Sequence, residues 1–502
     1  MRPRLLLLLL GVLLAQGAWL LSVPAFAGID EVDHVYRAAS VAHGDWLAGG
    51  DAAGHGRGDL VTVPRDLVAA AGPECRALTY TGHDNCAPAS GAPGGPHAPV
   101  QVASAAARYQ PAYYWVVGTT ARGLRGTAAV YAMRAVSALL CDLLLLLAAS
   151  SLSRWARTRW PAAALACCCT PVLVYSCVVV APNALEIAAA ISVWAALAGL
   201  CAHAPGPRTR RTLLWAAVPG AVALATTRSL GIGFLGLAVL AVLALLGRRG
   251  AADLARGSRG TLAATASVVG AAVVAGAAWL ATGQPNRVGG HLHNGGVLAG
   301  SLVQLPVWVL QSIAAAPGRR DPAPGVVYLL VGGVLLAVLV AALRCADRRL
   351  RTVLLLVAAA SLAGPFAVTL RTYRDLGVVW QGRYGMPLSL GVLLLAGLAL
   401  DRSPCARRLG RRTVVAGTAL LAVGQALAVR HAVDLERLRS PSVAGHLWHP
   451  PPDGLVVLMS VLGWLAVGAY VASTGSRRGV TSSAGAGVPA RRGDPSAVRS
   501  AS

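Results

Sequence analysis

Acidic, basic and imidazole side chains gather in one short stretch near the N-terminus, directly after an apolar run. Residues 28–37 read Gly-Ile-Asp-Glu-Val-Asp-His-Val-Tyr-Arg. At helical spacing Asp30, Asp33 and Arg37 lie on one face of a helix. His34 shares that face, because it follows Asp30 by four residues. Carboxylates placed in this way can accept protons or bind divalent cations, which makes the stretch a candidate for chemistry.

A purely structural explanation fits the same residues. Acidic side chains in the first turn of a helix interact favourably with the helix dipole. In addition, Asp33 and Arg37 have the spacing of an ordinary ion pair along a helix. Spacing alone therefore leaves both explanations open.

Two further polar segments stand next to apolar runs. The aromatic segment at residues 109–115 includes Tyr113 and Tyr114, and anchoring at the membrane interface would also explain it. Further along, Asn183 precedes Glu186 by three positions, which is the form of a capping box at the start of a helix. Both segments remain candidates for function beside these structural roles.

A third segment places a guanidinium where lipid headgroups lie. Gln381, Arg383 and Tyr384 lead into an apolar run. Arg383 there either extends toward water or holds a phosphate through its planar fork. Arg134 and Asp142 lie within an apolar run of their own. Ionisable groups are costly inside a bilayer, so these two are functional candidates.

Apolar helices must position these polar groups. The composition of the chain is rich enough in apolar residues to form such helices. Of the 502 residues, 56% are hydrophobic and 13% charged, whereas a soluble domain carries about 25% charged residues. A helix needs about 20 mostly apolar residues to cross the hydrocarbon. About twelve segments qualify, at residues 5–23, 128–151, 161–180, 184–203, 212–227, 229–247, 260–281, 325–343, 352–370, 386–401, 413–429 and 455–473. We therefore expect an all-α fold, a polytopic transmembrane helical bundle of about 10–13 helices, with a large outer loop after the first helix.

The charge of the chain follows its topology. All 44 basic residues are Arg, and the net charge is +24. If the N-terminus is cytoplasmic, the cytoplasmic segments hold 26 Arg and 4 Asp. The other face, without the two ionisable residues of the second helix, holds 17 Arg and 15 acidic residues. This is the pattern of the positive-inside rule. We expect a multi-pass cell-membrane protein with both termini in the cytoplasm and no nucleic-acid partner.

Three regions lie outside the predicted spans. Residues 24–125 form the largest extracytoplasmic loop. A second outer segment at residues 282–325 contains an apolar stretch at residues 297–316 that predicts a surface helix. The membrane domain then covers residues 1–472, and the Gly-, Ser- and Arg-rich residues 473–502 predict a disordered cytoplasmic tail.

Two other patterns have simple interpretations. Residues 5–21, followed by Ala-Phe-Ala, resemble a signal peptide, but a run of about 17 apolar residues is longer than the usual hydrophobic region, so we expect an uncleaved first helix. Residues 231–236 match the G-x-G-x-x-G pattern of dinucleotide-binding proteins. Because this match lies within a predicted span, it indicates close helix packing.

The ten cysteines divide by side of the membrane. Six lie in or at the ends of apolar spans, and Cys345 and Cys405 are in cytoplasmic segments. Cys75 and Cys86 alone face outward, close together in the large loop. Because the exterior is oxidising, we expect these two to form a disulfide.

The order of the polar motifs resembles that of a known family. The motifs are Asp30-Glu31-x-x-His34-x-x-Arg37, Gln110-Pro111-x-Tyr113-Tyr114, Arg134 in the second helix, Pro182-Asn183-x-x-Glu186 and Gln381-Gly382-Arg383-Tyr384-x-x-Pro387. Over about residues 1–430 this order looks like the bacterial predicted membrane protein family called domain of unknown function 2142 (DUF2142). Such proteins commonly carry Pro-Pro-x-Tyr-Tyr, where this chain has Gln110-Pro111. The family is similar in plan to the GT-C glycosyltransferases, which use polyprenyl-phosphate sugars and carry an acidic motif in the first outer loop.

The resemblance implies a sugar transferase on the outer face of the membrane. Its donor would be a polyprenyl-phosphate sugar, and its acceptor a glycan, lipid or protein of the cell envelope. Asp30 and Glu31 would be the catalytic residues, and they could also hold a divalent cation such as Mg²⁺ or Mn²⁺. Arg383 and Arg134 would neutralise the departing lipid phosphate. The expected substrate-binding residues are Asp33, His34, Arg37, Tyr113, Tyr114, Arg134, Glu186, Gln381, Arg383 and Tyr384.

Two other classes of function fit the composition. A membrane transporter or lipid flippase would need charged or helix-breaking residues through several spans, and Asp142 is the clearest such residue. A non-catalytic envelope assembly protein is the third possibility. Because the polar positions otherwise concentrate on the outer face, the sequence favours an enzyme that acts there.

Overall fold

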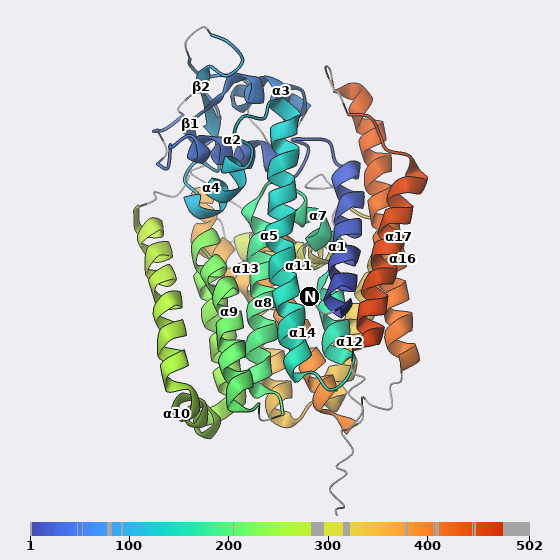
Figure 1. Cartoon of the computed structure of the whole chain (residues 1–502). Helices are drawn as coiled ribbons and strands as arrows, with labels where there is room; N and C mark the ends of the chain where they lie inside the picture. Colours follow the sequence, from blue (N-terminus) through green and yellow to red (C-terminus); the bar gives the residue numbers. More distant parts are fainter. Residues whose placement is uncertain are drawn as a thin grey trace, which may run out of the picture.

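Long apolar segments form helices in this chain because a bilayer offers backbone groups no hydrogen-bond partners, and a helix satisfies those groups internally. The computed structural model describes residues 3–474, apart from residues 48, 53, 78–82, 92–93, 204, 283–295, 315–321, 377–379, 405, 407–410, 444 and 446–447. The long helices are α1 (Pro3–Ser22), α5 (Gly126–Trp155), α8 (Pro182–Cys201), α9 (Pro207–Thr227), α10 (Gly231–Thr282), α12 (Gly325–Cys345), α13 (Arg348–Leu376), α14 (Met386–Arg402), α16 (Arg411–Arg439) and α17 (Asp453–Ser473). They stand side by side as one bundle (Figure 1).

Helices α8 and α14 form the centre of this bundle. They bury 94% and 83% of their most apolar stretches, whereas α12 and α13 bury only 28% each and so present most of that surface outward. A bent pair, α6 (Trp160–Cys168) and α7 (Pro171–Cys177), is also buried, with an angle of 64° between its two halves. The bend falls where Thr170 accepts a hydrogen bond from the backbone of Leu173 and starts a new helix.

The predicted spans are helical, which confirms the expected transmembrane bundle. Among the described residues ten helices, or eleven when α6 and α7 count as one span, have the length and hydropathy to cross a membrane; this set includes α11 (Gly296–Ile313) and leaves out α9. Two predicted spans, residues 229–247 and 260–281, lie in the single element α10. The backbone of α10 is non-helical at Gly247 and Ser258, and Figure 1 shows a short piece of α10 at the lower end of the bundle.

The G-x-G-x-x-G segment lies at the start of α10, but only its first glycine packs closely, because Gly233 and Gly236 have no neighbour within 4 Å of an added Cβ atom. A Cβ atom on Gly231 would lie only 1.9 Å from the carbonyl oxygen of Leu224 in α9. No larger residue fits at that distance, so the glycine allows the two helices to approach closely.

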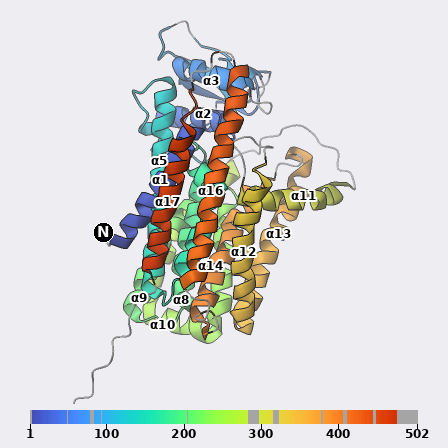
Figure 2. The same cartoon turned by 90° about the vertical axis from the view of Figure 1, so that its right-hand side faces the viewer.

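Helix α11 (Gly296–Ile313) lies across the bundle rather than along it (Figure 2). This orientation agrees with the surface helix predicted at residues 297–316. On one side α11 exposes Leu302 and Val303 by 54% and 75%, whereas Ser301 and Trp308 are buried. Such a division is typical of a helix that rests in the interface between water and hydrocarbon. Parts of the predicted outer segment around α11, and the predicted tail from residue 475 onward, lie outside the described residues.

A smaller layer covers the upper end of the bundle (Figure 1). We call this region, residues 24–125, the outer layer. Its elements are α2 (Glu31–Ala42), β1 (Asp59–Pro64), α3 (Arg65–Ala77), the 3-10 helix η1 (His83–Cys86), β2 (Pro99–Ser104) and α4 (Pro111–Thr119). Strands β1 and β2 pair antiparallel, from Asp59 opposite Ser104 to Pro64 opposite Pro99. The structure joins Cys75 to Cys86 in the expected disulfide, which ties α3 to η1.

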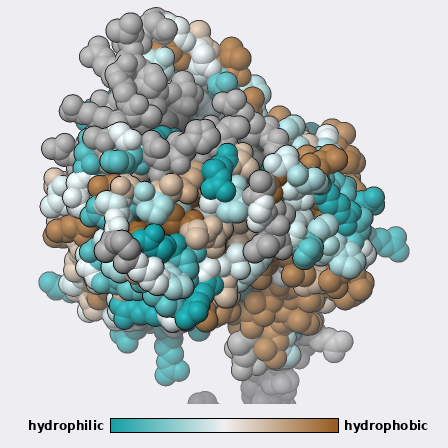
Figure 3. Space-filling model, turned by 90° about the horizontal axis from the view of Figure 1, so that it is seen from above, coloured by the Kyte–Doolittle hydropathy of each residue, from teal (hydrophilic) through white to brown (hydrophobic). Residues whose placement is uncertain are grey.

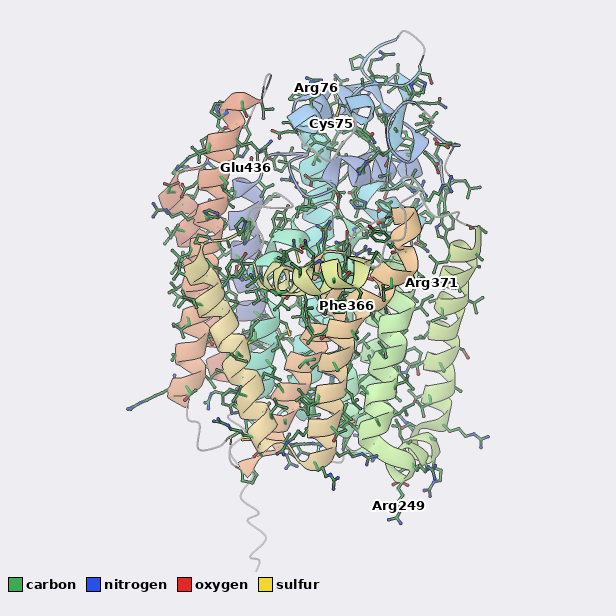
Figure 4. All side chains as sticks on the ribbon, turned by 180° about the vertical axis from the view of Figure 1, so that it is seen from behind. Cys75, Arg76, Arg249, Phe366, Arg371 and Glu436 are labelled. Carbon is green, nitrogen blue, oxygen red and sulfur yellow. A yellow bond between two sulfur atoms is a disulfide. The ribbon has the colours of Figure 1, made fainter. Side chains whose placement is uncertain are left out.

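The outer layer and the arginine-rich loops occupy opposite ends of the molecule. Figure 4 shows Cys75, Arg76 and Glu436 at one end and Arg249 at the other. Seen from the outer side, the surface mixes hydrophilic and hydrophobic residues, and a hydrophobic area lies along part of its edge (Figure 3). This separation is what the positive-inside pattern requires if the outer layer is extracytoplasmic.

Labelling in intact cells tests this orientation. We expect a cysteine introduced at Leu47, which is 72% exposed in the outer layer, to react with a membrane-impermeant maleimide. A cysteine at Arg256, whose side chain is 78% exposed at the arginine-rich end, should react only after permeabilisation. Both variants should lack Cys345 and Cys405, so that native thiols on that side give no signal. Labelling of the Arg256 variant in intact cells would reverse the topology.

Candidate functional site

An ion pair between Asp30 and Arg383 lies where the outer layer meets the bundle. Asp30 occupies the N-cap position of α2 with φ 59°, a left-handed conformation that is uncommon outside glycine but tolerated by aspartate. Its side chain makes no capping hydrogen bond. It accepts a hydrogen bond of 2.7 Å from Nη2 of Arg383. The structure therefore speaks against capping as the role of Asp30.

Arg383 is held in place by the crosswise helix α11. It belongs to the 3-10 helix η2 (Gly382–Gly385), which precedes α14. The backbone N–H of Gly382 donates to Oε1 of Gln311 at 2.9 Å. A Cβ atom on Gly382 would lie 1.9 Å from the carbonyl oxygen of Trp308, so this position requires glycine. Gln381, which was expected to bind substrate, is partly exposed, and its carbonyl accepts a hydrogen bond from the N–H of Tyr384.

A second guanidinium, that of Arg228, lies close to the first. Arg228 connects α9 to α10, and its Nη1 lies 3.3 Å from Oε2 of Glu186. Its Cζ lies 4.4 Å from the centre of the Tyr384 ring, and the Cζ of Arg383 lies 5.5 Å from the same centre. The sequence analysis missed Arg228. Its position in a short polar break between two outward-ending spans was a signal that could have identified it.

Aromatic side chains surround His34 beside these charges. Nδ1 of His34 and the hydroxyl of Tyr114 are 2.7 Å apart, and the ring of Tyr109 meets the imidazole edge to face at 5.4 Å. Burial lowers the pKa of His34 to about 3; Asp30 acts against this shift, and Arg383 adds to it. His34 is therefore neutral at physiological pH and acts as a hydrogen-bonding group. Tyr109 is a second residue of the site that the sequence analysis did not single out.

Glu31 and Arg134 form a buried ion pair with no exposed side-chain surface. Nε and Nη2 of Arg134 donate to the two oxygens of Glu31 at 2.7 and 2.6 Å. The same guanidinium donates to the carbonyls of Val23 and Pro24. Glu31 also accepts the backbone N–H groups of Gly28 and Val180. This placement favours a structural role for both side chains over the catalytic and phosphate-binding roles that the sequence predicts.

Asp33 and Arg37 organise the loops of the outer layer. Oδ1 of Asp33 accepts the N–H of Ala105 at 2.7 Å. Arg37 is fully buried and donates to the carbonyls of Asp45, Trp46 and Tyr109. Arg37 therefore fixes backbone segments that lie far apart in the sequence. These contacts favour positioning of the site over direct binding of substrate.

Tyr113 and Tyr114 are buried and point in different directions. The hydroxyl of Tyr113 lies 3.0 Å from that of Ser137 in α5, whereas Tyr114 contacts His34. Their exposed fractions are 4% and 0%. Burial of this kind does not fit the alternative that the pair anchors the chain in the membrane interface, because interfacial aromatic side chains keep one end in contact with water.

The predicted capping box at Asn183 and Glu186 is wrong. Helix α8 begins one residue before Asn183, with Ala181 as its N-cap, and has no side-chain capping bond. Pro182 explains the difference, because its fixed φ suits the first helical position. Asn183 and Glu186 therefore lie inside the helix, both buried, and Glu186 is paired with Arg228.

The carboxylates do not form a suitable site for the divalent cation that the sequence suggested. Four hydrogen bonds already saturate Glu31, and Asp30 is paired with Arg383. Two guanidiniums at the same place oppose a further positive charge. Among the described residues no group of three or more His, Cys, Asp or Glu side chains is arranged to hold a metal ion. We therefore assign no step of the chemistry to a metal.

Replacing Glu31 separates its structural role from a catalytic one. Glu31→Gln leaves the buried guanidinium of Arg134 without its counter-charge, and we expect a loss of about 3–5 kcal/mol in stability. The melting temperature of the purified protein and its yield from membranes measure this loss. Asp30→Asn affects the neighbouring and more exposed ion pair with Arg383, and its amide oxygen can still accept from Arg383, so it should lower both much less. A stable but inactive Glu31→Gln protein would return Glu31 to the reaction.

Comparison with known proteins gives one family and two solved structures. The chain matches the family described as "Predicted membrane protein (DUF2142)" over residues 13–392. No curated protein matches it. Among solved structures it is similar to ArnT from Cupriavidus metallidurans in the apo state, with 16% sequence identity and a TM-score of 0.44. It is also similar to the same protein bound to undecaprenyl phosphate, with 17% identity and a TM-score of 0.41. Each alignment covers 92% of this chain and 76% of the other. Because the family match spans well over half of its residues, the chain belongs to the DUF2142 family of predicted membrane proteins.

Proposed function

We propose that this protein is an integral membrane glycosyltransferase. It moves a sugar from a polyprenyl-phosphate donor to a hydroxyl group of a cell-envelope glycan, lipid or protein on the outer face. The observation that carries the proposal is one partly accessible carboxylate, Asp30, paired with the guanidinium of Arg383, while the guanidinium of Arg228 lies against the same Tyr384 ring as Arg383. Such a group combines a base with anion-stabilising charges at the edge of the bilayer.

Asp30 is the base in this reaction. Its side chain is 16% exposed, whereas that of Glu31 is fully buried. The acceptor hydroxyl gives its proton to the Asp30 carboxylate, and its oxygen forms a bond to the anomeric carbon of the sugar. The bond from that carbon to the phosphate oxygen breaks, and polyprenyl phosphate leaves with the electron pair. Arg383 must move away from Asp30 for the carboxylate to accept a proton readily.

Arg383 and Arg228 stabilise the leaving group. A phosphodiester donor carries one negative charge, and the released phosphate monoester carries nearly two. Guanidiniums that meet this growing charge contribute more in the transition state than in the bound donor, which is the requirement for catalysis. In the structure each arginine is paired with an acid, Asp30 or Glu186, so the cluster is close to neutral until an anion arrives.

Helix α11 gives the lipid part of the donor a place beside this cluster. Its apolar side chains Leu298, Leu302 and Val303 are at least half exposed, and α11 contacts η2, the element that carries Arg383. A polyprenyl chain in the bilayer next to α11 would bring its phosphate to the level of the guanidiniums.

A transporter is less well supported by the same geometry. Asp142, the strongest candidate for a through-membrane path, accepts a hydrogen bond of 2.8 Å from Gln16 in α1. The ion pairs Asp30–Arg383, Glu31–Arg134 and Glu186–Arg228 all lie toward the outer end of the bundle. This concentration favours chemistry at the outer surface.

The conservative change Asp30→Asn tests the base. Asparagine keeps the shape of aspartate and also tolerates the left-handed backbone, but it cannot take the proton. We expect transfer from labelled polyprenyl-phosphate sugars, measured with purified protein in liposomes, to fall by about a hundredfold or more. Asp453→Asn, which affects a paired carboxylate at the end of α17, is the matched control and should keep full activity. Full activity of Asp30→Asn would remove Asp30 from the reaction.

Replacement of Arg383 by lysine tests the phosphate-binding role. Lysine keeps the positive charge but loses the planar fork that binds two oxygens at once, so we expect turnover to fall by about tenfold or more at unchanged expression. Arg371→Lys, an exposed arginine near the outer end of α13 (Figure 4), serves as the control. Equal turnover of the Arg383→Lys and wild-type proteins would mean that the side chain merely extends toward water.

A further inference from the structure

Several buried polar atoms near Arg228 are not satisfied by the protein itself. Glu186 is 2% exposed; its Oε2 pairs with Arg228, but its Oε1 has no hydrogen-bond partner among the described residues. Asn183, one turn earlier on the same face of α8, is 5% exposed, and within the same part of the chain its Nδ2 has no partner either. Native proteins rarely leave buried polar atoms unmet without a functional reason.

Two more buried donors without a partner lie on the segment that leads into α14. Trp380 is 8% exposed and its Nε1–H lacks a partner in the described residues, as does Nε of Arg383. Arg228 contacts Glu186 and stacks on Tyr384, and the ring of Trp380 packs edge to face on Tyr384 at 5.8 Å. A chain of contacts therefore links Glu186 to Trp380 through Arg228 and Tyr384, and Asn183 lies one helical turn from Glu186.

The structural explanations for Glu186 and Asn183 leave this cluster unexplained. Neither residue caps α8, since the helix begins at Pro182. The pairing with Arg228 occupies only one oxygen of Glu186. One acceptor and three N–H donors remain, which is the set of groups that recognises hydroxyl and ring oxygens of a sugar.

We infer that Glu186, Asn183 and Trp380 form a subsite for the sugar of the lipid-linked donor, and that this sugar is hydroxylated. Glu186 Oε1 accepts a hydroxyl proton, and the N–H groups of Asn183 and Trp380 donate to sugar oxygens. This inference rests on the proposed function, because it assumes a lipid-phosphate sugar as the donor.

Binding to two defined lipids tests the subsite. The probes are polyprenyl phosphate without a sugar and polyprenyl-phosphate glucose, each titrated against the full-length protein in nanodiscs. The wild-type protein should bind the glucose lipid more tightly. Glu186→Gln should weaken binding of the glucose lipid about tenfold or more, because a hydrogen bond to a charged group is lost, and it should not weaken binding of the sugar-free lipid, because Arg228 keeps its charge. The control is Glu74→Gln, another buried acid paired with an arginine in the outer layer, which should change neither affinity.

A second variant covers the case in which Glu186→Gln does not fold. Asn183→Leu replaces a buried amide that lacks a protein partner by an apolar group of similar size. We expect an unchanged or raised melting temperature without ligand, together with weaker binding of the glucose lipid. A lowered melting temperature with unchanged binding would show that Asn183 serves the fold, and the subsite would be withdrawn.

The outcomes distinguish this inference from the proposed function. Equal binding of the glucose and sugar-free lipids by the wild-type protein, or equal losses for both in Glu186→Gln, overturns the subsite alone. If the wild-type protein binds neither lipid, the proposed function itself fails and the inference fails with it.

Discussion

A guanidinium buried at the edge of a membrane must have all its donors satisfied, and this requirement at Arg134 organises the outer half of the molecule. Arg134 extends from α5 and holds the carbonyls at the end of α1 and the carboxylate at the start of α2. Glu31 in turn accepts the backbone N–H of Val180, just before α8. Three regions that are distant in sequence, residues 23–31, Arg134 and Val180, therefore meet at one ion pair.

The position of Asp30 follows from this arrangement. Asp30 is adjacent to Glu31, so the contacts that hold Glu31 also determine where the backbone of Asp30 lies. The left-handed conformation at Asp30 then places its carboxylate within 2.7 Å of Arg383. Glu31 is thus used to build the site, and Asp30 is left at the surface of the site. Of these two neighbouring acids, Glu31 is fully buried and Asp30 stays partly exposed.

Much of the fold could be predicted from the distribution of apolar and charged residues along the sequence. The helices, the crosswise α11 and the cysteine pair follow from hydropathy and from the side of the membrane on which each segment lies. The division of labour between Asp30 and Glu31 could not be predicted, because it depends on hydrogen bonds to Arg134 more than a hundred residues away. Asn183 was misinterpreted because a proline starts the helix two residues earlier than a cap at Asn183 would. The cytoplasmic position of the termini and the disordered tail stay predictions.

The contact between α11 and η2 has a mechanical consequence. Gly382 lies so close to the backbone of α11 that neither element can move without the other, and the next residue is Arg383. Helix α11 rests crosswise with its apolar side exposed. A displacement of α11 in the bilayer would therefore also shift Arg383 relative to Asp30. The ion pair between these two side chains would then depend on the physical state of the surrounding lipid.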